Sequence, residues 1–478
     1  MGCRYALGEL CEFRRGASIP RACMLDKGGY LYIHYGDLYK GFSYRIDVKH
    51  PQKPIPHIRS DEKIKDSQWL EDQDIVYVLT SETVDDLGHA FLFNNPEHMP
   101  AVSGTETTIV HVNRPNVVIP AYLNYLMHAP LFVRMLRQYV RGMKVFRVHP
   151  DDVARIEVDV PTLDKQRKIV SMLDVIQAKL CINSHTNDYL LGCAKAIFEY
   201  WLTNADGPLR PISKIALLNP DTYSTKEKWS LVQYLDTGSI MRGDIAEYQI
   251  IEPDKDKLPS RARRKVKSGD IVYSTVRPNQ KHYGILLNLE GNVLVSTGFA
   301  VVRAISDRVC PELLYLFLTQ DKLTKSLQQI AEQSVSTYPS IKADDLGALE
   351  MPTPTEGEAA ELRDSLQLLF KCIEVNRQEN VRIAELRDAL LPKLMSGEVD
   401  VSRVDIMLPN NHLPAQSTAT PHTVPNPLKG KEQFPGRHHQ YRFVPHAAPA
   451  RCAPAQAAQG HDESRIRACQ DLASLGPG

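Results

Sequence analysis

Two long stretches of the chain carry apolar residues in alternating steps of four and three, the spacing of helices that pack along one seam. The first seam comprises Ile169, Leu173, Ile176, Leu180, Asn183, Asn187, Leu190, Ala194, Ile197 and Trp201. The second comprises Leu362, Leu366, Leu369, Ile373, Asn376, Asn380, Ile383, Arg387, Leu390 and Leu394, each 193 positions after its counterpart. The pattern predicts two long helices, each about 55 Å in length at ~1.5 Å per residue.

A pair of asparagines interrupts each predicted seam near its middle: Asn183 and Asn187 in the first, Asn376 and Asn380 in the second. In an antiparallel pairing Asn183 would face Asn380, and Asn187 would face Asn376. Buried amides of this kind fix the register of paired helices at some cost in stability. A parallel pairing would match them too, and two amphipathic helices packed separately on their own domains are the alternative.

A duplication extends beyond the helices. Short motifs recur in the same order, at offsets that drift between 191 and 202 positions as loop insertions would make them. The recurring pairs are Tyr32 and Gly36 with Tyr234 and Gly238, 74–77 with 270–273, 102–105 loosely with 295–298, 151–152 with 344–345, and 161–162 with 352–353. Five matches in one order indicate two copies of one unit.

The segments outside the helices predict mixed α/β structure, with strand-like runs at 74–79 and 270–273 and short helices at Pro120–Tyr139 and Pro311–Ala331. The expected fold class is therefore α+β. Two similar mixed α/β domains, 1–160 and 205–351, would be separated by two long helices, within 161–204 and 352–402, that form an antiparallel coiled coil. Residues 403–478 are rich in Pro, Ala, His and Gln without apolar periodicity, which predicts disorder.

Composition narrows the class of protein without identifying it. The 478 residues are 43% apolar and 24% charged, with a formal net charge of +0, so any DNA-binding surface must be local. No apolar run is long enough to predict a membrane span. The nine cysteines are scattered and form no CxxC pair, which predicts the reduced thiols of a cytoplasmic protein rather than zinc sites or disulfides.

The sequence lacks the catalytic motifs that would point to an enzyme. It has no GxxxxGK[ST] phosphate loop, no GxSxG elbow and no HExxH pair. Asn95-Pro96 and Asn219-Pro220 are not followed by the aromatic residue that ends an amino-methyltransferase tetrad. Residues 61–63, Asp-Glu-Lys, resemble a nuclease fragment only superficially, since charged residues in a polar stretch are usually solvated. We expect no catalytic residue and no metal site in this chain.

Clusters of basic residues are more informative than the net charge. One lies in an acid-free stretch of the first half, and others flank Asp270 in the second half. Such clusters suit contacts with phosphates, and Arg, Asn and Gln can also read base edges. A solvated basic surface or a protein contact is the alternative. The residues expected to contact DNA are Arg141, Lys144, Arg147, Arg264, Lys265, Arg277, Asn279, Gln280 and Lys281.

Three sets of residues resemble motifs of the specificity subunits of type I restriction–modification enzymes. Tyr32…Gly36-Asp37 and Tyr234…Gly238 resemble an early strand and turn. Residues 270–278 (DIVYSTVRP) resemble the central strand and its DNA-side loop, and 390–399 (LLPKLMSGEV) resemble the usual ending of the second helix. The resemblance covers about residues 5–402, and the last motif is the most specific.

The resemblance implies a non-catalytic subunit in which each α/β domain reads one half of a bipartite double-stranded DNA target. The paired helices would set the gap between the two half-sites and would bind the modification subunits. These would carry S-adenosylmethionine and methylate adenine, and restriction subunits would use ATP and Mg²⁺, so this chain would bind no cofactor itself. The alternatives are a stand-alone sequence-specific DNA-binding regulator, a coiled-coil adaptor without a nucleic-acid role, and a nuclease active by itself.

Overall fold

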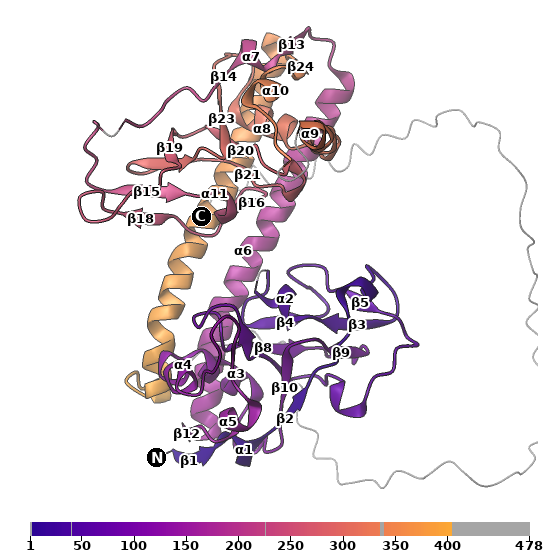
Figure 1. Ribbon diagram of the computed structural model, residues 1–478, viewed down its shortest axis with the longest axis vertical. Helices are drawn as coiled ribbons and strands as arrows, with labels where there is room; N and C mark the ends of the chain where they lie inside the picture. Colours follow the sequence, from indigo (N-terminus) through magenta and orange to yellow (C-terminus); the bar gives the residue numbers. More distant parts are fainter. Residues whose placement is uncertain (1, 40, 225, 335–338, 404–478) are drawn as a thin grey trace, which may run out of the picture. The chain divides into compact units, whose positions relative to one another are not determined.

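The computed structural model describes residues 2–39, 41–224, 226–334 and 339–403 (Figure 1). These residues form two α/β regions, residues 2–160 and 209–352, together with two long helices. We call them the first and the second region. Residues 404–478, which make up nearly all of the segment predicted to be disordered, lie outside the described residues.

The first region contains twelve strands and several short helices. In chain order they are β1 (Cys3–Ala6), α1 (Leu7–Leu10), β2 (Cys11–Arg15), η1 (Arg21–Cys23), β3 (Tyr30–Ile33), α2 (Tyr35–Leu38), β4 (Arg45–Asp47), β5 (His57–Ile58), η2 (Asp66–Gln68), β6 (Ile75–Val78), β7 (Thr80–Ser81), β8 (His89–Asn94), β9 (Ala101–Ser103), β10 (Thr107–Val112), α3 (Pro120–His128), α4 (Pro130–Arg137), β11 (Phe146–Arg147), α5 (Pro150–Ala154) and β12 (Glu157–Val160). The long helix α6 (Leu163–Asn204) follows.

The second region has a similar order of elements. Its elements are β13 (Leu209–Pro211), α7 (Ile212–Ile215), β14 (Ala216–Leu218), β15 (Val232–Leu235), η3 (Thr237–Ser239), β16 (Ile240–Met241), β17 (Asp244–Ile245), β18 (Gln249–Ile251), β19 (Ala262–Lys265), β20 (Ile271–Ser274), η4 (Pro278–Gln280), β21 (Tyr283–Ile285), β22 (Val293–Ser296), β23 (Phe299–Ala304), α8 (Pro311–Leu318), α9 (Asp321–Ser334), α10 (Ala343–Gly347) and β24 (Glu350–Pro352). The long helix α11 (Glu356–Ser396) and η5 (Val401–Arg403) end the described chain.

The main sheet of the first region has the strand order β2-β10-β6-β8-β4. Its central strand β6 is antiparallel to both neighbours, with Ile75 opposite Val110 and Leu92. All four residues of β6 are buried, because alternate side chains enter two different apolar clusters on the two faces. This explains why the strand reads as an uninterrupted apolar run rather than an alternating one.

The second region has the same plan. Its main sheet, β14-β23-β20-β21, again places the Asp-Ile-Val-Tyr strand inside. Each region also has a smaller sheet with one parallel pair, β3 with β9 and β15 with β22. Its first and last strands pair antiparallel, β1 with β12 and β13 with β24. The duplication in the sequence is therefore a duplication of structure.

Helices α6 and α11 lie side by side and run in opposite directions (Figure 1). Leu173, early in α6, shares a core with Leu391, late in α11, whereas Phe198 shares the other core with Leu366. Helix α11 begins at a capping box, in which the Thr355 backbone N–H donates to Glu358 at 2.7 Å. It ends at Gly397, whose φ of +77° suits glycine.

The two segments predicted to be helical, Pro120–Tyr139 and Pro311–Ala331, are helical, and each is divided into two short helices. Ala129 separates α3 from α4 with extended backbone angles (φ −65°, ψ 137°). The cause is Pro130, since proline disfavours the helical conformation of the residue before it. No proline marks the second division, where α8 ends at Leu318 and α9 begins at Asp321.

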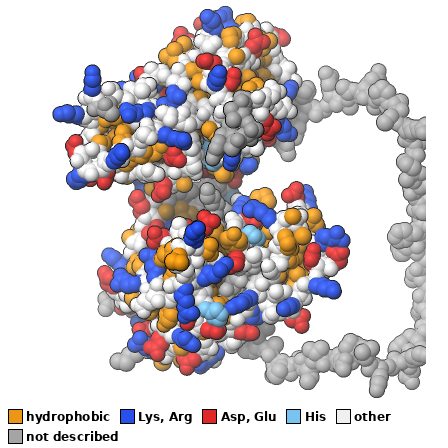
Figure 2. All heavy atoms as spheres, viewed as in Figure 1, with side chains coloured by type: hydrophobic (Ala, Val, Ile, Leu, Met, Phe, Trp, Pro, Cys, Tyr) orange, Lys and Arg blue, Asp and Glu red, His pale blue; other side chains and the backbone are white. Residues whose placement is uncertain are grey.

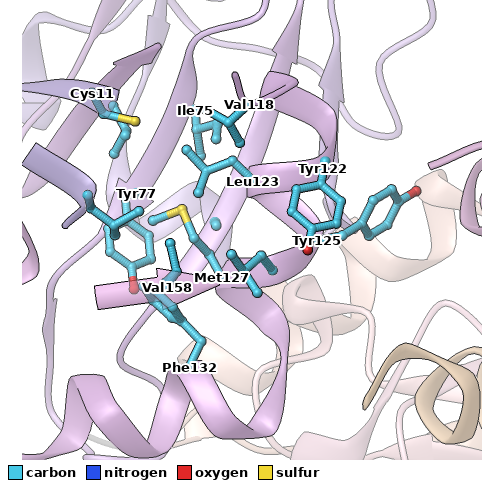
Figure 3. Packing of buried hydrophobic residues seen from close by; sticks show 14 of the residues in the cluster. Cys11, Ile75, Tyr77, Val118, Tyr122, Leu123, Tyr125, Met127, Phe132 and Val158 are labelled. Atoms are coloured by element: carbon cyan, nitrogen blue, oxygen red, sulfur yellow. The ribbon is translucent and has the colours of Figure 1, made fainter. Parts of the chain in front are cut away.

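The core of the first region forms between the main sheet and the helices that cover it. Figure 3 shows Leu123 of α3 close to Ile75 of β6, and Met127 of α3 close to Tyr77 of β6. The same cluster includes buried residues of both long helices. Because a shared core resists relative movement, the ends of the long helices are held firmly by the region that they contact.

Candidate nucleic-acid interface

The predicted DNA-contact residues of the second region lie in two places, and the first is the loop after β20. This loop contains η4, and both residues that flank η4 have left-handed backbone angles. Arg277 has φ 47° and Lys281 has φ 57°. Non-glycine residues adopt such angles rarely and at a cost in energy, and they do so most often at functional sites.

Contacts with α9 and the residues after it hold this strained loop in place. The Arg277 backbone N–H donates to the Pro339 carbonyl at 2.9 Å, and the Asn279 N–H donates to the Gln328 side chain at 3.2 Å. The Lys281 ammonium pairs with Asp321, so this predicted DNA contact already has an anionic partner. The side chains of Asn279 and Gln280 are exposed. The loop is therefore a rigid support that presents amide side chains to solvent.

The second place is β19, where neighbouring cations have different surroundings. Lys265 donates to both oxygens of Glu227, at 3.0 and 2.9 Å, and lies 6.0 Å from the centre of the Trp229 ring. Hydrogen bonding to Lys265 lowers the pKa of Glu227. Arg264 has no carboxylate partner within the described parts of the chain, its Nε is buried without a hydrogen-bond partner, and burial lowers its pKa. A guanidinium without a counter-ion suits a phosphate supplied from outside.

In the first region the predicted cations lie on a hairpin, residues 141–147, whose ends are joined by backbone hydrogen bonds of 2.9 and 2.8 Å between Arg141 and Arg147. Arg141 also pairs with Asp152 at 2.9 Å, and Arg147 pairs with Glu106 at 3.4 Å. Lys144 is exposed between them. The structure thus brings Arg141, Lys144 and Arg147 together, and it orients the two arginines through carboxylates from outside the hairpin.

Charge is mixed across the molecule. Figure 2 shows Lys and Arg interspersed with Asp and Glu over the face in view, without a wholly basic surface. This agrees with the net charge of +0. The cations suited to DNA are therefore those of the three local elements: the hairpin, β19 and the loop after β20.

The asparagines predicted to pair the long helices do contact one another. The Asn183 amide donates to Asn380 at 2.8 Å, and the Asn376 amide donates to Asn187 at 2.8 Å. Asn183 also donates to Glu379 at 2.7 Å, and Lys179 pairs with Glu379 at 2.9 Å. These contacts match the antiparallel partners expected from the sequence. They form a polar layer between the two apolar cores.

Sequence reasoning missed the polar residues that join α6 to the first region. Gln166 is fully buried, and its side chain accepts from the Ile119 N–H and donates to the carbonyls of Val117 and Pro161, each at 2.8 Å. Further along the helix, Asp174 pairs with Arg45 and accepts from the Tyr125 hydroxyl. Gln166 lies three residues before Ile169 and so continues the seam spacing, but a heptad pattern of apolar residues carries no signal for a buried glutamine.

No group of three His, Cys, Asp or Glu side chains suited to a metal ion occurs in residues 2–39, 41–224, 226–334 and 339–403. Asp61, part of the fragment weighed as a nuclease motif, accepts two hydrogen bonds from Arg59, at 2.8 and 2.6 Å. No helix in the described part of the chain is long and apolar enough to cross a membrane.

Comparison with known proteins gives one match to a protein family. Residues 4–190 match the model of the family described as "Type I restriction modification DNA specificity domain". This stretch covers the first region and more than half of α6. Over residues 4–190, the match confirms the resemblance that the sequence motifs indicated.

Individual relatives carry related descriptions. The chain is 31% identical over 159 residues to the Type I restriction enzyme HindI specificity subunit of Haemophilus influenzae, an alignment that covers 33% of this chain and 34% of that protein. It is 20% identical over 309 residues to the MjaIX specificity subunit of Methanocaldococcus jannaschii, with 60% and 71% covered. The chain therefore spans about a third of the first relative and about seven-tenths of the second.

Solved structures with a similar description also match. One is a crystal structure of a type I restriction–modification system S subunit from M. genitalium, which is 12% identical to this chain. The match covers 82% of this chain and 95% of that chain, with a TM-score of 0.48.

Proposed function

We propose, from the match of residues 4–190 to the model of the type I restriction–modification DNA specificity domain family, that the chain is the DNA-recognition subunit of a type I restriction–modification complex. Each α/β region would be a target-recognition domain that reads one half of a bipartite target. The chain would be non-catalytic. S-adenosylmethionine, ATP and Mg²⁺ would act on the modification and restriction subunits.

One observation carries this proposal: the same α/β fold occurs twice, and each copy shares an apolar core with a different end of an antiparallel pair of long helices. Two copies held in this way are suited to contact two separate DNA segments. Helix α6 has 42 residues, which span about 63 Å at ~1.5 Å per residue. That length exceeds one turn of DNA, about 34–36 Å, so the helix pair would serve as a spacer that sets the gap between half-sites.

Exposed apolar residues on the outer faces of the helices support the proposal that two modification subunits bind there. Val175 and Ile182 of α6 are 51% and 59% exposed, and Leu368 and Val375 of α11 are 42% and 54% exposed. The second pair repeats the first at the offset of 193 positions. Exposed apolar residues in heptad spacing suit partner helices, and their duplication suits two copies of one partner.

The deciding experiment is a methylome. The chain would be co-expressed with its modification subunit in a methylation-deficient host, and modified adenines would be mapped across the genome. We expect a split motif with a fixed gap that is methylated only when this chain is present. A soluble complex that adds no methylation would contradict the proposal.

The alternative, a stand-alone DNA-binding regulator, predicts a different result. A regulator would bind its target with full affinity without modification subunits, and the binding would weaken with salt. The proposed subunit would bind the split motif tightly only in the assembled complex. Filter binding of the chain with and without its modification subunit distinguishes the two.

A further inference from the structure

The hairpin of the first region carries an apolar side chain at its tip. Met143 is 94% exposed, the highest value among the large hydrophobic residues of the described chain, and its neighbour Val145 is 41% exposed. Single exposed apolar side chains are normal on protein surfaces, but Met143 lies between Arg141 and Lys144, with Arg147 at the other end of the hairpin. Nothing in the described chain covers it.

The hairpin is built rigidly at its base and tightly at its turn. Phe146 and Arg147 pair with Ser81 and Thr80, so the base forms a two-stranded sheet with β7. Gly142 has φ +119°, and a Cβ atom there would lie 2.0 Å from the Val145 carbonyl oxygen. Only glycine suits this turn. The paired base and the tight turn therefore hold the tip of the hairpin in a fixed position.

The positive charge around the tip of the hairpin indicates what kind of partner it could contact. No Asp or Glu occurs between Glu106 and Asp151 in the sequence. Arg141 and Arg147 are held at the base by Asp152 and Glu106, yet their side chains remain 74% and 62% exposed. Apolar side chains flanked by cations suit DNA, where the cations contact phosphates and the apolar group enters between base pairs.

We propose that Met143 is a wedge that inserts into a base step of the half-site read by the first region and partly unstacks it. This inference rests on the proposed function and adds to it a deformation of the DNA. Unstacking costs least at pyrimidine–purine steps. The half-site of the first region should therefore contain such a step under the hairpin, selected by deformability rather than by hydrogen bonds.

The test uses the assembled complex and the target identified by its methylome. Duplexes would carry 2-aminopurine at successive positions of each half-site, because its fluorescence rises when the base is unstacked. The adenine that is methylated in each half-site leaves the base stack, so with the wild-type complex we expect a rise there and one further rise at a step of the first half-site only. Met143→Ala should abolish this further rise and lower the affinity roughly tenfold, the change that ~1.4 kcal/mol produces. Met143→Leu should retain most of both.

Met241 of β16 offers a matched control, since it is a methionine of the second region with 45% exposure. Met241→Ala should leave the fluorescence rise and the affinity unchanged. The wedge is wrong if the wild-type complex binds and methylates its target without a fluorescence rise beyond that at the methylated adenines, or if Met143→Ala behaves like the wild type. It is equally wrong if Met143→Ala prevents assembly, which would make the tip a protein contact. A wild-type complex that neither binds nor methylates a split target would overturn the proposed function itself.

Discussion

The aspartate before the central strand is buried in both α/β regions, but its cationic partner differs. Both oxygens of Asp270 accept hydrogen bonds from Arg303, each at 2.7 Å. Asp74 instead contacts His111 at 2.7 Å and Arg14 at 3.2 Å. His111 and Arg303 occupy equivalent positions, each one residue before the end of its strand and opposite the second residue of the first strand of the main sheet.

The difference shows what a duplicated scaffold keeps and what it changes. The register of the shared strands is kept, because a slip of one residue would turn apolar side chains toward water. The polar pairs vary as long as the buried carboxylate has a partner. Hydrogen bonding to Asp270 raises the pKa of Arg303, whereas burial raises the pKa of Asp74 above its usual range. The second region thus holds the more completely hydrogen-bonded pair, since both oxygens of Asp270 bind one guanidinium.

The largest effect should come from changing the separation of the two regions. We expect deletion of one heptad from each long helix, residues 176–182 and the facing residues 381–387, to keep the Asn layer and shorten the spacer by about 10 Å. Methylation of the original sites should be lost, and sites with a gap shorter by about three base pairs should replace them.

A methylome of the deletion variant measures this change. Deleting 176–182 alone is the control, since it misaligns the seam and should prevent assembly. An assembled variant that still methylates the original motif would show that the helices do not set the gap.

A second test compares the two buried aspartates directly. Asp270→Asn leaves Arg303 with Asp221 alone, and breaking a buried pair in this way should cost about 3–5 kcal/mol. Asp74→Asn should cost less, about 1–2 kcal/mol, because burial already disfavours its charged form. Hydrogen exchange of peptides from β20 and β6 reports each region separately. Equal losses of protection would show that the two pairs are equivalent.

A third test separates the reading of the two half-sites. Arg277→Ala should weaken recognition of the half-site read by the second region by about 1–3 kcal/mol and leave the other half-site unchanged. Methylation of single-base variants of the target would measure this. Arg308→Ala is the control, an exposed arginine of the same region outside the loop. Unchanged affinity and specificity in Arg277→Ala would remove the loop after β20 from the interface.

The sequence predicts the long helices and the duplication well, because heptads and repeated motifs are local or periodic signals. Pro130 also carries a signal for the division between α3 and α4, whereas the division after Leu318 has none that we recognise. The candidate site is less accessible to sequence reasoning. Basic side chains can be found by inspection, but the carboxylates that hold them, such as Asp152 and Asp321, come from other elements. Which cations remain without a partner, as Arg264 does among the described residues, depends on tertiary structure.

The smallest effect is a pH dependence expected from Asp74. Because its folded-state pKa is raised, the folded first region binds its proton more tightly than the unfolded chain does. The stability from this group is fully present below the usual aspartate pKa, about 3.9, and is lost as pH rises through the raised pKa. Asp74→Asn has no such loss. The difference in the free energy of unfolding between the wild type and the variant should therefore shrink with rising pH, by ~1.4 kcal/mol for each unit of pKa shift.

Trp69 is the one tryptophan of the first region, so a Trp201→Phe/Trp229→Phe background makes its fluorescence report unfolding there. Urea midpoints of this background with and without Asp74→Asn, measured from about pH 4 to about pH 8, give the difference directly. Asp26→Asn, at an exposed position of the same region, should show a difference that does not vary with pH. If the Asp74→Asn difference is just as flat, the buried carboxylate titrates as it does in the unfolded chain, and the contrast with the Arg303 pair is one of geometry alone.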